Sequence, residues 1–159
     1  EQDINYIENN YSTVVETVNK IESLLDKYFS DEGKKVILIA DDSNIILNFL
    51  EKSIHNEYSI LKARTGNEAI EIIKSNDLYA ILLDLNMPSL NGFDVLAYLK
   101  EENLLEKIPV VIITGDDTEE TIKKAFSYGI LDVLNKPFTE ENITRVLTSI
   151  ENFYERDKI

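Results

Sequence analysis

Five short apolar runs recur along most of the chain, and turn-forming residues bound each of them. They are Val36–Ala40, Tyr58–Ala63, Ala80–Leu83, Pro109–Thr114 and Leu131–Lys136. About a dozen residues with amphipathic spacing separate each run from the next, which is typical of strand–helix–strand units. Strands joined in this way run parallel and carry helices on both faces of their sheet. The pattern therefore predicts an α/β fold built on a doubly wound, five-stranded parallel sheet.

Three of the intervening helices are expected to begin after a hydroxyl residue, because Ser and Thr side chains cap free backbone N–H groups. These residues are Ser43, Thr118 and Thr139. Each is followed by apolar residues at helical spacing, which form the stripe that a helix packs against a core. The stripes consist of Ile46, Phe49 and Leu50, then Ile122, Ala125 and Phe126, and finally Ile143, Val146, Leu147, Ile150 and Phe153.

The first part of the chain, residues 1–33, has a different period. Its apolar and aromatic residues alternate in steps of three and four, which is the heptad pattern of a helix with a narrow apolar seam. They are Ile4, Ile7, Tyr11, Val14, Val18, Ile21, Leu25 and Tyr28. We expect this helix to end near Gly33 and an α/β domain to span residues 34–157. The helix either dimerises as a coiled coil, connects to an upstream domain or packs on its own neighbour.

Composition excludes several classes of function. The net charge of −14 repels phosphate backbones and anionic lipids, so direct contact with nucleic acid or with a membrane is not expected. The chain has no Cys, which excludes disulfides and thiolate metal sites and fits a cytoplasmic location. It begins with Glu1 and without a signal peptide, so we expect it to be part of a larger protein.

Polar residues stand where the predicted strands end. Asp41 and Asp42 follow the first strand, Asp84 follows the third, Thr114 ends the fourth and Lys136 follows the fifth. Each has a plainer explanation when taken alone, such as a helix cap, a turn former or a surface lysine. Because ligands of doubly wound sheets bind at the carboxyl ends of the strands, the five residues are instead expected to form one site.

The residue types at this edge indicate phosphoryl chemistry. Clustered carboxylates repel one another and raise one another's pKa, and a hard divalent cation such as Mg²⁺ relieves that repulsion. A carboxylate is also a nucleophile towards phosphorus. The cation, the ammonium group of Lys136 and the hydroxyl group of Thr114 would then neutralise the charge on a transferred phosphoryl group.

These motifs resemble the receiver domain of two-component response regulators over about residues 34–156. The resemblance is carried by "LIADDS", "LLDLNMPSLNG", "VVIITGD" and "NKPF", in this order and within the strand–helix alternation. It implies a flavodoxin-like sheet with strand order 2-1-3-4-5, with the N-terminal helix as an addition. It also implies a bacterial, cytoplasmic signalling protein.

The resemblance assigns a role to each acidic residue. Asp84 is implied as the residue that accepts the phosphoryl group. Asp41, Asp42 and Asp84 would hold Mg²⁺ together with the backbone carbonyl group of Asn86. Catalysis would be limited to the domain's own phosphorylation and dephosphorylation, and any kinase or output activity would lie in another domain.

The remaining implied roles concern the switch. Thr114 would bind a phosphoryl oxygen and draw its loop inward, and Lys136 would pair with the phosphoryl group, aimed by a cis bond to Pro137. The family often carries an aromatic residue three positions before this lysine, where this chain has Val133. Output is therefore expected through movement of the helix after Thr114, or the domain acts as a relay or a phosphoryl sink.

The resemblance implies a histidine kinase or a histidine phosphotransfer protein as partner. A homodimer through the N-terminal helix, or through the last helix–strand–helix face, is a further expectation. The parent is left open between a hybrid sensor kinase, a multidomain regulator and a free-standing regulator.

Two alternative functions remain at this stage. A haloacid-dehalogenase-like phosphatase also uses a strand-end Asp, a hydroxyl and a Lys. That class expects a second acid two residues after the nucleophile, where this chain has Asn86, and has no use for the Asp41–Asp42 pair. The other alternative is a pseudo-receiver that binds partners without being phosphorylated.

Overall fold

The computed structural model describes the backbone of residues 2–156 and the side chains of residues 8, 10–25 and 33–156. The chain divides into two units, Glu1–Lys34 and Lys35–Ile159. None of the described helices is long and apolar enough to cross a membrane.

The first unit is a single helix, α1, which spans Gln2–Gly33 and so ends at the glycine expected to stop it. The heptad side chains that the structure describes are exposed, from 46% for Val18 to 72% for Tyr11. The side chains of Ile4, Ile7 and Tyr28, which belong to the same heptad pattern, lie outside the described residues.

The second unit contains the predicted parallel sheet, with its strands in the order β2-β1-β3-β4-β5. The strands are β1 (Lys35–Ala40), β2 (Tyr58–Ala63), β3 (Ala80–Asp84), β4 (Val110–Thr114) and β5 (Asp132–Asn135). The helices are α2 (Asn44–Ile54), α3 (Gly66–Ser75), α4 (Gly92–Glu101), α5 (Glu119–Ser127) and α6 (Glu140–Glu155). Every neighbouring pair of strands is parallel, so the five carboxyl ends lie at one edge of the sheet.

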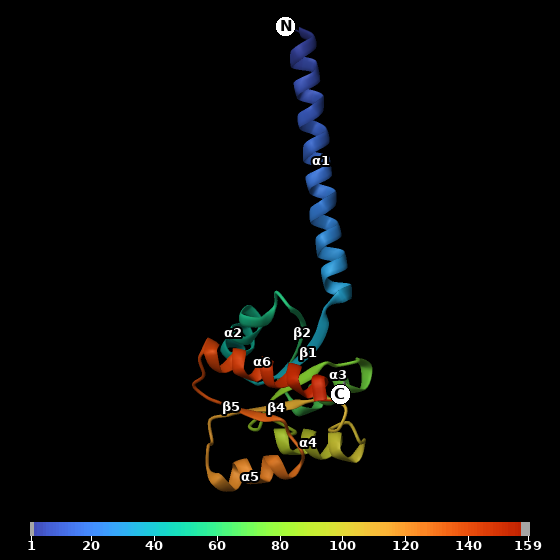
Figure 1. Ribbon diagram of the computed structural model, residues 1–159. Coiled ribbons are helices and arrows are strands. Elements are labelled where there is room, and N and C mark those ends of the chain that lie inside the picture. Colours follow the sequence, from blue (N-terminus) through green and yellow to red (C-terminus); the bar gives the residue numbers. More distant parts are fainter. Residues whose placement is uncertain (1, 157–159) are drawn as a thin grey trace. The chain divides into compact units, whose positions relative to one another are not determined.

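Two helical layers cover the sheet, as Figure 1 shows, with α2 and α6 on one face and α3, α4 and α5 on the other. Successive residues of the central strands alternate between the two layers. In β3, Leu82 packs with the α2–α6 layer, whereas Ile81 and Leu83 pack with the opposite layer. Both faces of the strand are buried, which explains why the sequence shows unbroken apolar runs instead of an alternating pattern.

The predicted caps are present at all three helices. Ser43, Thr118 and Thr139 each accept a hydrogen bond from a backbone N–H group in the first turn of the helix that follows. Because these caps satisfy N–H groups that would otherwise lack a partner, each helix begins directly behind the strand end that precedes it.

Two of the predicted apolar stripes differ from the buried faces. Phe126 is 46% exposed and Phe49 is 39% exposed, although both were expected to pack as part of a stripe. In α2 the buried residues are Leu47, Leu50 and Ile54, so the face turned to the sheet is centred differently around the helix. Phe49 instead lies at the rim, where its ring centroid is 5.9 Å from that of Phe138.

Candidate functional site

Asp84 is the last residue of β3 and is only 2% exposed. Its Oδ1 atom accepts a hydrogen bond of 3.0 Å from the backbone N–H group of Asn86, which fixes the carboxylate at the start of the following loop. The loop then returns so closely that a Cβ atom on Gly92 would lie 2.4 Å from the carbonyl oxygen of Asp84. Only glycine fits at position 92 without moving the backbone that carries Asp84.

The acidic pair lies beside Asp84. Asp41 is fully buried directly after β1, and its Oδ1 atom accepts a hydrogen bond of 2.9 Å from the backbone N–H group of Ser43. Asp42 is exposed. One carboxylate oxygen from each of Asp41, Asp42 and Asp84 lies within 4.8 Å of the others, so the structure brings the three predicted acids together.

Lys136 reaches this cluster from the end of β5. Its Nζ atom lies 2.8 Å from Oδ2 of Asp41 and 3.3 Å from Oδ2 of Asp84. The Lys136–Pro137 peptide bond is cis, as the resemblance implied. The backbone N–H group of Lys136 also donates a hydrogen bond of 2.8 Å to the carbonyl oxygen of Thr114, which ties the end of β5 to the end of β4.

The charges in the cluster act on one another. Burial raises the pKa of Asp84 to about 6; the Asn86 N–H group lowers it, the charge of Asp41 raises it and Lys136 lowers it. Burial lowers the pKa of Lys136, but the hydrogen bond and charges from Asp41 and Asp84 outweigh that effect and raise it. At neutral pH the site therefore holds an ionised carboxylate at Asp84 beside an ammonium group.

Oδ2 of Asp41 retains capacity for a further ligand. The atom is buried, and the ammonium group of Lys136, 2.8 Å away, is the one cation that the described residues place against it. Buried carboxylate oxygens in such a cluster are the hard donors that Mg²⁺ prefers. The residues present at this site thus fit a magnesium ion.

Thr114 lies at the adjacent strand end and is fully buried. Its hydroxyl group accepts a hydrogen bond of 3.0 Å from the N–H group of Asp116 and donates one of 3.2 Å to the carbonyl oxygen of Asp116. Within the described part of the chain it makes no hydrogen bond to Asp84. The hydroxyl group is therefore held in its own turn, at the edge of the cluster.

Asp116 extends this arrangement to helix α5. Its Oδ1 atom accepts a hydrogen bond from the N–H group of Thr118, and its Oδ2 atom accepts one from the hydroxyl group of Thr121, both at 3.0 Å. These hydrogen bonds lower the pKa of Asp116. A continuous set of hydrogen bonds thus joins the Thr114 hydroxyl group to the first turn of α5.

One contact near the site has no counterpart in the sequence-based predictions. The N–H group of Gly66, the first residue of α3, donates a hydrogen bond of 3.1 Å to the carbonyl oxygen of Leu90, in the loop after Asp84. A Cβ atom on Gly66 would lie 2.2 Å from that oxygen. The only hint in the sequence is a glycine directly after the helix cap Thr65, where no turn requires one.

The family follows from a comparison with known domains. The sequence model of the response regulator receiver domain matches residues 37–148. The chain belongs to this receiver family. As a receiver domain it accepts a phosphoryl group in two-component signalling, where such domains interact with histidine kinases or phosphotransfer proteins.

Relatives of known description carry the same domain in different settings. The chain is 32% identical over 128 residues to a probable cyclic di-GMP phosphodiesterase of Vibrio cholerae, covering 80% of the chain and 29% of the relative. It is also 32% identical over 129 residues to the transcriptional regulatory protein CrdR of Helicobacter pylori, covering 79% and 57%. The chain thus spans about a third and somewhat over half of these two relatives' lengths.

Solved receiver structures share the fold. The receiver domain of the Francisella response regulator 1452 superposes with a TM-score of 0.68 at 29% identity, covering 78% of the chain and 99% of that domain. The signal receiver domain of a putative Luxo repressor protein from Vibrio parahaemolyticus gives a TM-score of 0.72 at 24% identity, covering 78% and 95%. Other relatives come from Dictyostelium and Arabidopsis, so receivers of this kind are not restricted to bacteria. Nothing in these comparisons favours the phosphatase or the pseudo-receiver alternative.

Proposed function

We propose that Asp84 is the residue of this receiver that accepts the phosphoryl group. The supporting observation is the buried Asp84 carboxylate at the end of β3, with Lys136 Nζ 3.3 Å from its Oδ2 atom and two further acids beside it. A buried carboxylate with a fixed ammonium partner suits attack on phosphorus, because the same cation then faces the charge that arrives.

The reaction is a displacement at phosphorus. An Asp84 oxygen forms a P–O bond while the P–N bond of a phosphohistidine on the kinase or phosphotransfer protein breaks, and the imidazole leaves with the electron pair of that bond. The Asp84 carboxylate must be ionised to attack, and its pKa of about 6 leaves it ionised at neutral pH. Lys136 pairs with the phosphoryl oxygens and offsets their charge.

Asp41, Asp42 and Asp84, with the carbonyl group of Asn86, would hold Mg²⁺ at this site. When bound, the cation lowers the repulsion between the carboxylates and the incoming phosphoryl group. This assignment draws on the clustered acids and on the buried Oδ2 atom of Asp41, which has a single cationic neighbour among the described residues and room for a further ligand.

Thr114 acts as the switch in this proposal. Its hydroxyl group leaves the turn with Asp116 and donates a hydrogen bond to a phosphoryl oxygen, which shifts a pre-existing equilibrium of the loop before α5. Val133 is 9% exposed within the core, and it offers no aromatic ring to follow that movement. The signal therefore leaves through α5, which the Asp116 hydrogen bonds couple to Thr114.

The test is the intact mass of the protein after incubation with Mg²⁺ and acetyl phosphate. We expect a gain of one phosphoryl group, lost in Asp84→Ala and on chelating Mg²⁺, and retained in the matched control Asp77→Ala, which replaces an exposed aspartate. Phosphorylation of the Asp84→Ala variant would refute the assignment. Steady turnover of small phosphate esters would favour the phosphatase alternative instead.

The N-terminal helix suggests how the domain is built into its parent. We propose that residues 1–33 form a helical linker that self-associates through the exposed heptad seam, ahead of a cytoplasmic receiver spanning residues 34–157. The parent is then a multidomain regulator or a hybrid kinase, and two relatives from Dictyostelium are named as hybrid signal transduction proteins. Light scattering gives the mass of each chain in solution. We expect the full chain to have a mass of more than one copy and residues 34–159 to have the mass of a single copy. If both have the mass of a single copy, self-association through the helix is refuted.

A further inference from the structure

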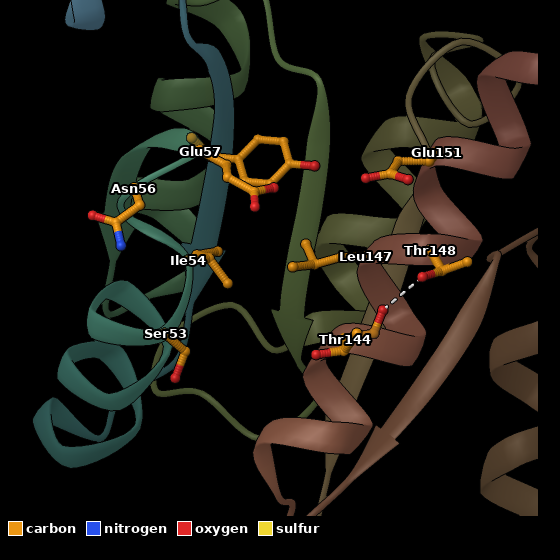
Figure 2. Close-up of a pocket in the computed structure, with 9 residues that line it drawn as sticks. Ser53, Ile54, Asn56, Glu57, Thr144, Leu147, Thr148 and Glu151 are labelled. Atoms are coloured by element: carbon orange, nitrogen blue, oxygen red, sulfur yellow. Dashed lines mark hydrogen bonds between the residues drawn. The ribbon is translucent and has the colours of Figure 1, made fainter.

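A cavity of about 280 Å³ lies between α2, the start of β2 and α6, and none of its lining residues belongs to the Asp84 site. Figure 2 shows it between the carboxyl-terminal end of α2 and one side of α6. A water molecule takes about 30 Å³, so the space is far larger than a bare ion or a single water requires. It approaches the size of sites for small organic ligands.

Three of the hydroxyl groups that line the cavity already donate their protons within their own helices, so they are left as acceptors for a ligand. Ser53, Thr144 and Thr148 each donate their single hydroxyl proton to a backbone carbonyl four residues earlier, at 2.8, 3.0 and 3.0 Å. The bond from Thr148 to the backbone of Thr144 is drawn in Figure 2. What these side chains offer to the cavity is therefore oxygen lone pairs.

Two carboxylates add negative charge to the same cavity. Glu57 and Glu151 both line it, and neither forms an ion pair with any basic residue in the part of the chain that the structure describes. Figure 2 shows them near one end of the cavity, on opposite sides. Carboxylates are acceptors only, so this end also calls for a donor.

Tyr58 adds a further hydroxyl group to the lining of the cavity. Its side chain lines the cavity and is 6% exposed, yet its hydroxyl group makes no hydrogen bond to any described residue. Burial, the charge of Tyr79 and the charges of Glu151 and Glu57 raise the pKa of Tyr58 to about 12. The hydroxyl oxygen itself is reached from the cavity, so a ligand there can hydrogen-bond to it.

The middle of the cavity is apolar. In Figure 2, Ile54 from α2 and Leu147 from α6 lie across from one another, between the carboxylate end and the end formed by Ser53 and Thr144. A ligand with an aliphatic body and N–H donors at its ends would match this arrangement better than a hydrated metal ion.

We propose that this cavity binds a small aliphatic organic cation, with a primary ammonium or guanidinium group at Glu57 and Glu151 and an aliphatic chain along Ile54 and Leu147. Hydrogen bonds from a charged donor to carboxylates are stronger than those between neutral groups. A second amino group at the far end of the chain would donate to the oxygens of Ser53 and Thr144. The net charge of −14 further favours a cation over neutral or anionic ligands.

The first experiment titrates the full chain with putrescine and records amide shifts by NMR and heats by calorimetry. Excess Mg²⁺ and about 150 mM salt are present, so that the Asp84 cluster and general attraction do not contribute. We expect saturable binding of one molecule, with shift changes centred on Glu57, Tyr58, Thr144 and Glu151. The neutral diol of the same chain length should bind far more weakly, because it lacks the charge.

Variants locate the binding. The double substitution Glu57→Gln and Glu151→Gln should weaken binding by about tenfold or more, since it removes charge-assisted hydrogen bonds. The matched control, Glu101→Gln with Glu102→Gln, removes the same charge from exposed residues outside the cavity and should leave the affinity unchanged. Tyr58→Phe, which keeps the ring and deletes the hydroxyl group, should weaken binding by a few-fold.

The same ammonium group could come from a free metabolite or from a lysine side chain of a partner. Nα-acetyl-lysine amide, whose side-chain ammonium group is free, serves as the second probe. Tighter binding of putrescine indicates a free metabolite, and tighter binding of the lysine derivative indicates a partner's lysine; either result supports the site. Equal affinity of the double variant and its control, shift changes spread evenly over the acidic surface, or no saturable binding of either probe would overturn the proposal.

Discussion

Replacing Gly66 by alanine should both destabilise the receiver and slow its phosphorylation. The new Cβ atom would lie 2.2 Å from the carbonyl oxygen and 2.5 Å from the Cβ atom of Leu90, whereas ordinary contacts begin at 3.4 Å. The loop must therefore retreat by about 1 Å, which costs about 1–3 kcal/mol as overpacking. The hydrogen bond from Gly66 to Leu90 contributes about another 1 kcal/mol, and the better helix propensity of alanine returns about as much. We expect a net loss of about 2 kcal/mol.

The loop that moves also carries Asn86, whose N–H group fixes the Asp84 carboxylate. A displacement of that size in a catalytic group commonly slows a reaction by about tenfold to a hundredfold. Urea unfolding gives the stability, and the rate of mass gain with acetyl phosphate gives the phosphorylation rate. Gly33→Ala is the matched control, because a Cβ atom at that position meets nothing within 4 Å. Wild-type stability and rate in Gly66→Ala would refute the contact's role.

Two further predictions concern charge. Lys136→Met leaves the buried carboxylates of Asp41 and Asp84 without their counter-charge and should lower the free energy of unfolding by about 2 kcal/mol in chelator, with Mg²⁺ restoring part of it. Equal urea midpoints for the variant and the wild type in chelator would contradict this. The pKa of Tyr58 is about 12 in the folded state and 10.0 in the unfolded chain. The folded state therefore favours the neutral phenol, and this contribution of about 2 kcal/mol to stability is fully present below pH 10 and is lost as the pH rises towards 12. Urea unfolding at pH 9 and at about pH 11.5 measures this loss. The free energy of unfolding should fall less in Tyr58→Phe than in the wild type over this range, because the variant has no phenol to ionise. Equal falls in the two proteins would contradict the raised pKa.

Several parts of this architecture were predictable from the sequence because they follow from local chemistry. Parallel strands buried on both faces, such as β3, produce unbroken apolar runs, and Ser43 and Thr139 mark helix starts by their capping chemistry. Once the strands were known to be parallel, Asp84 and Lys136 had to lie at the same edge. The strand order came from the resemblance to receivers, since local pattern does not reveal which strands pair.

Contacts between distant segments were not predictable in this way. The approach of Gly66 to Leu90 depends on the path of two loops, and the stack of Tyr58, Tyr79 and Tyr154 depends on three separate elements. Phe126 matched the helical period but is exposed, because the period fixes which residues share a stripe and not how the helix is rotated against the sheet.

The site also has a consequence for the synthesis of the chain. Lys136 stands 52 residues after Asp84, and the two meet only when β5 has paired with β4 at the far edge of the sheet. A ribosome therefore exposes the three acids well before their ammonium partner, so a nascent chain carries an incomplete acidic cluster. Under the proposed assignment, a fragment that ends before Lys136 would hold the three acids without the ammonium group that faces Asp84, and we expect such a fragment not to be phosphorylated.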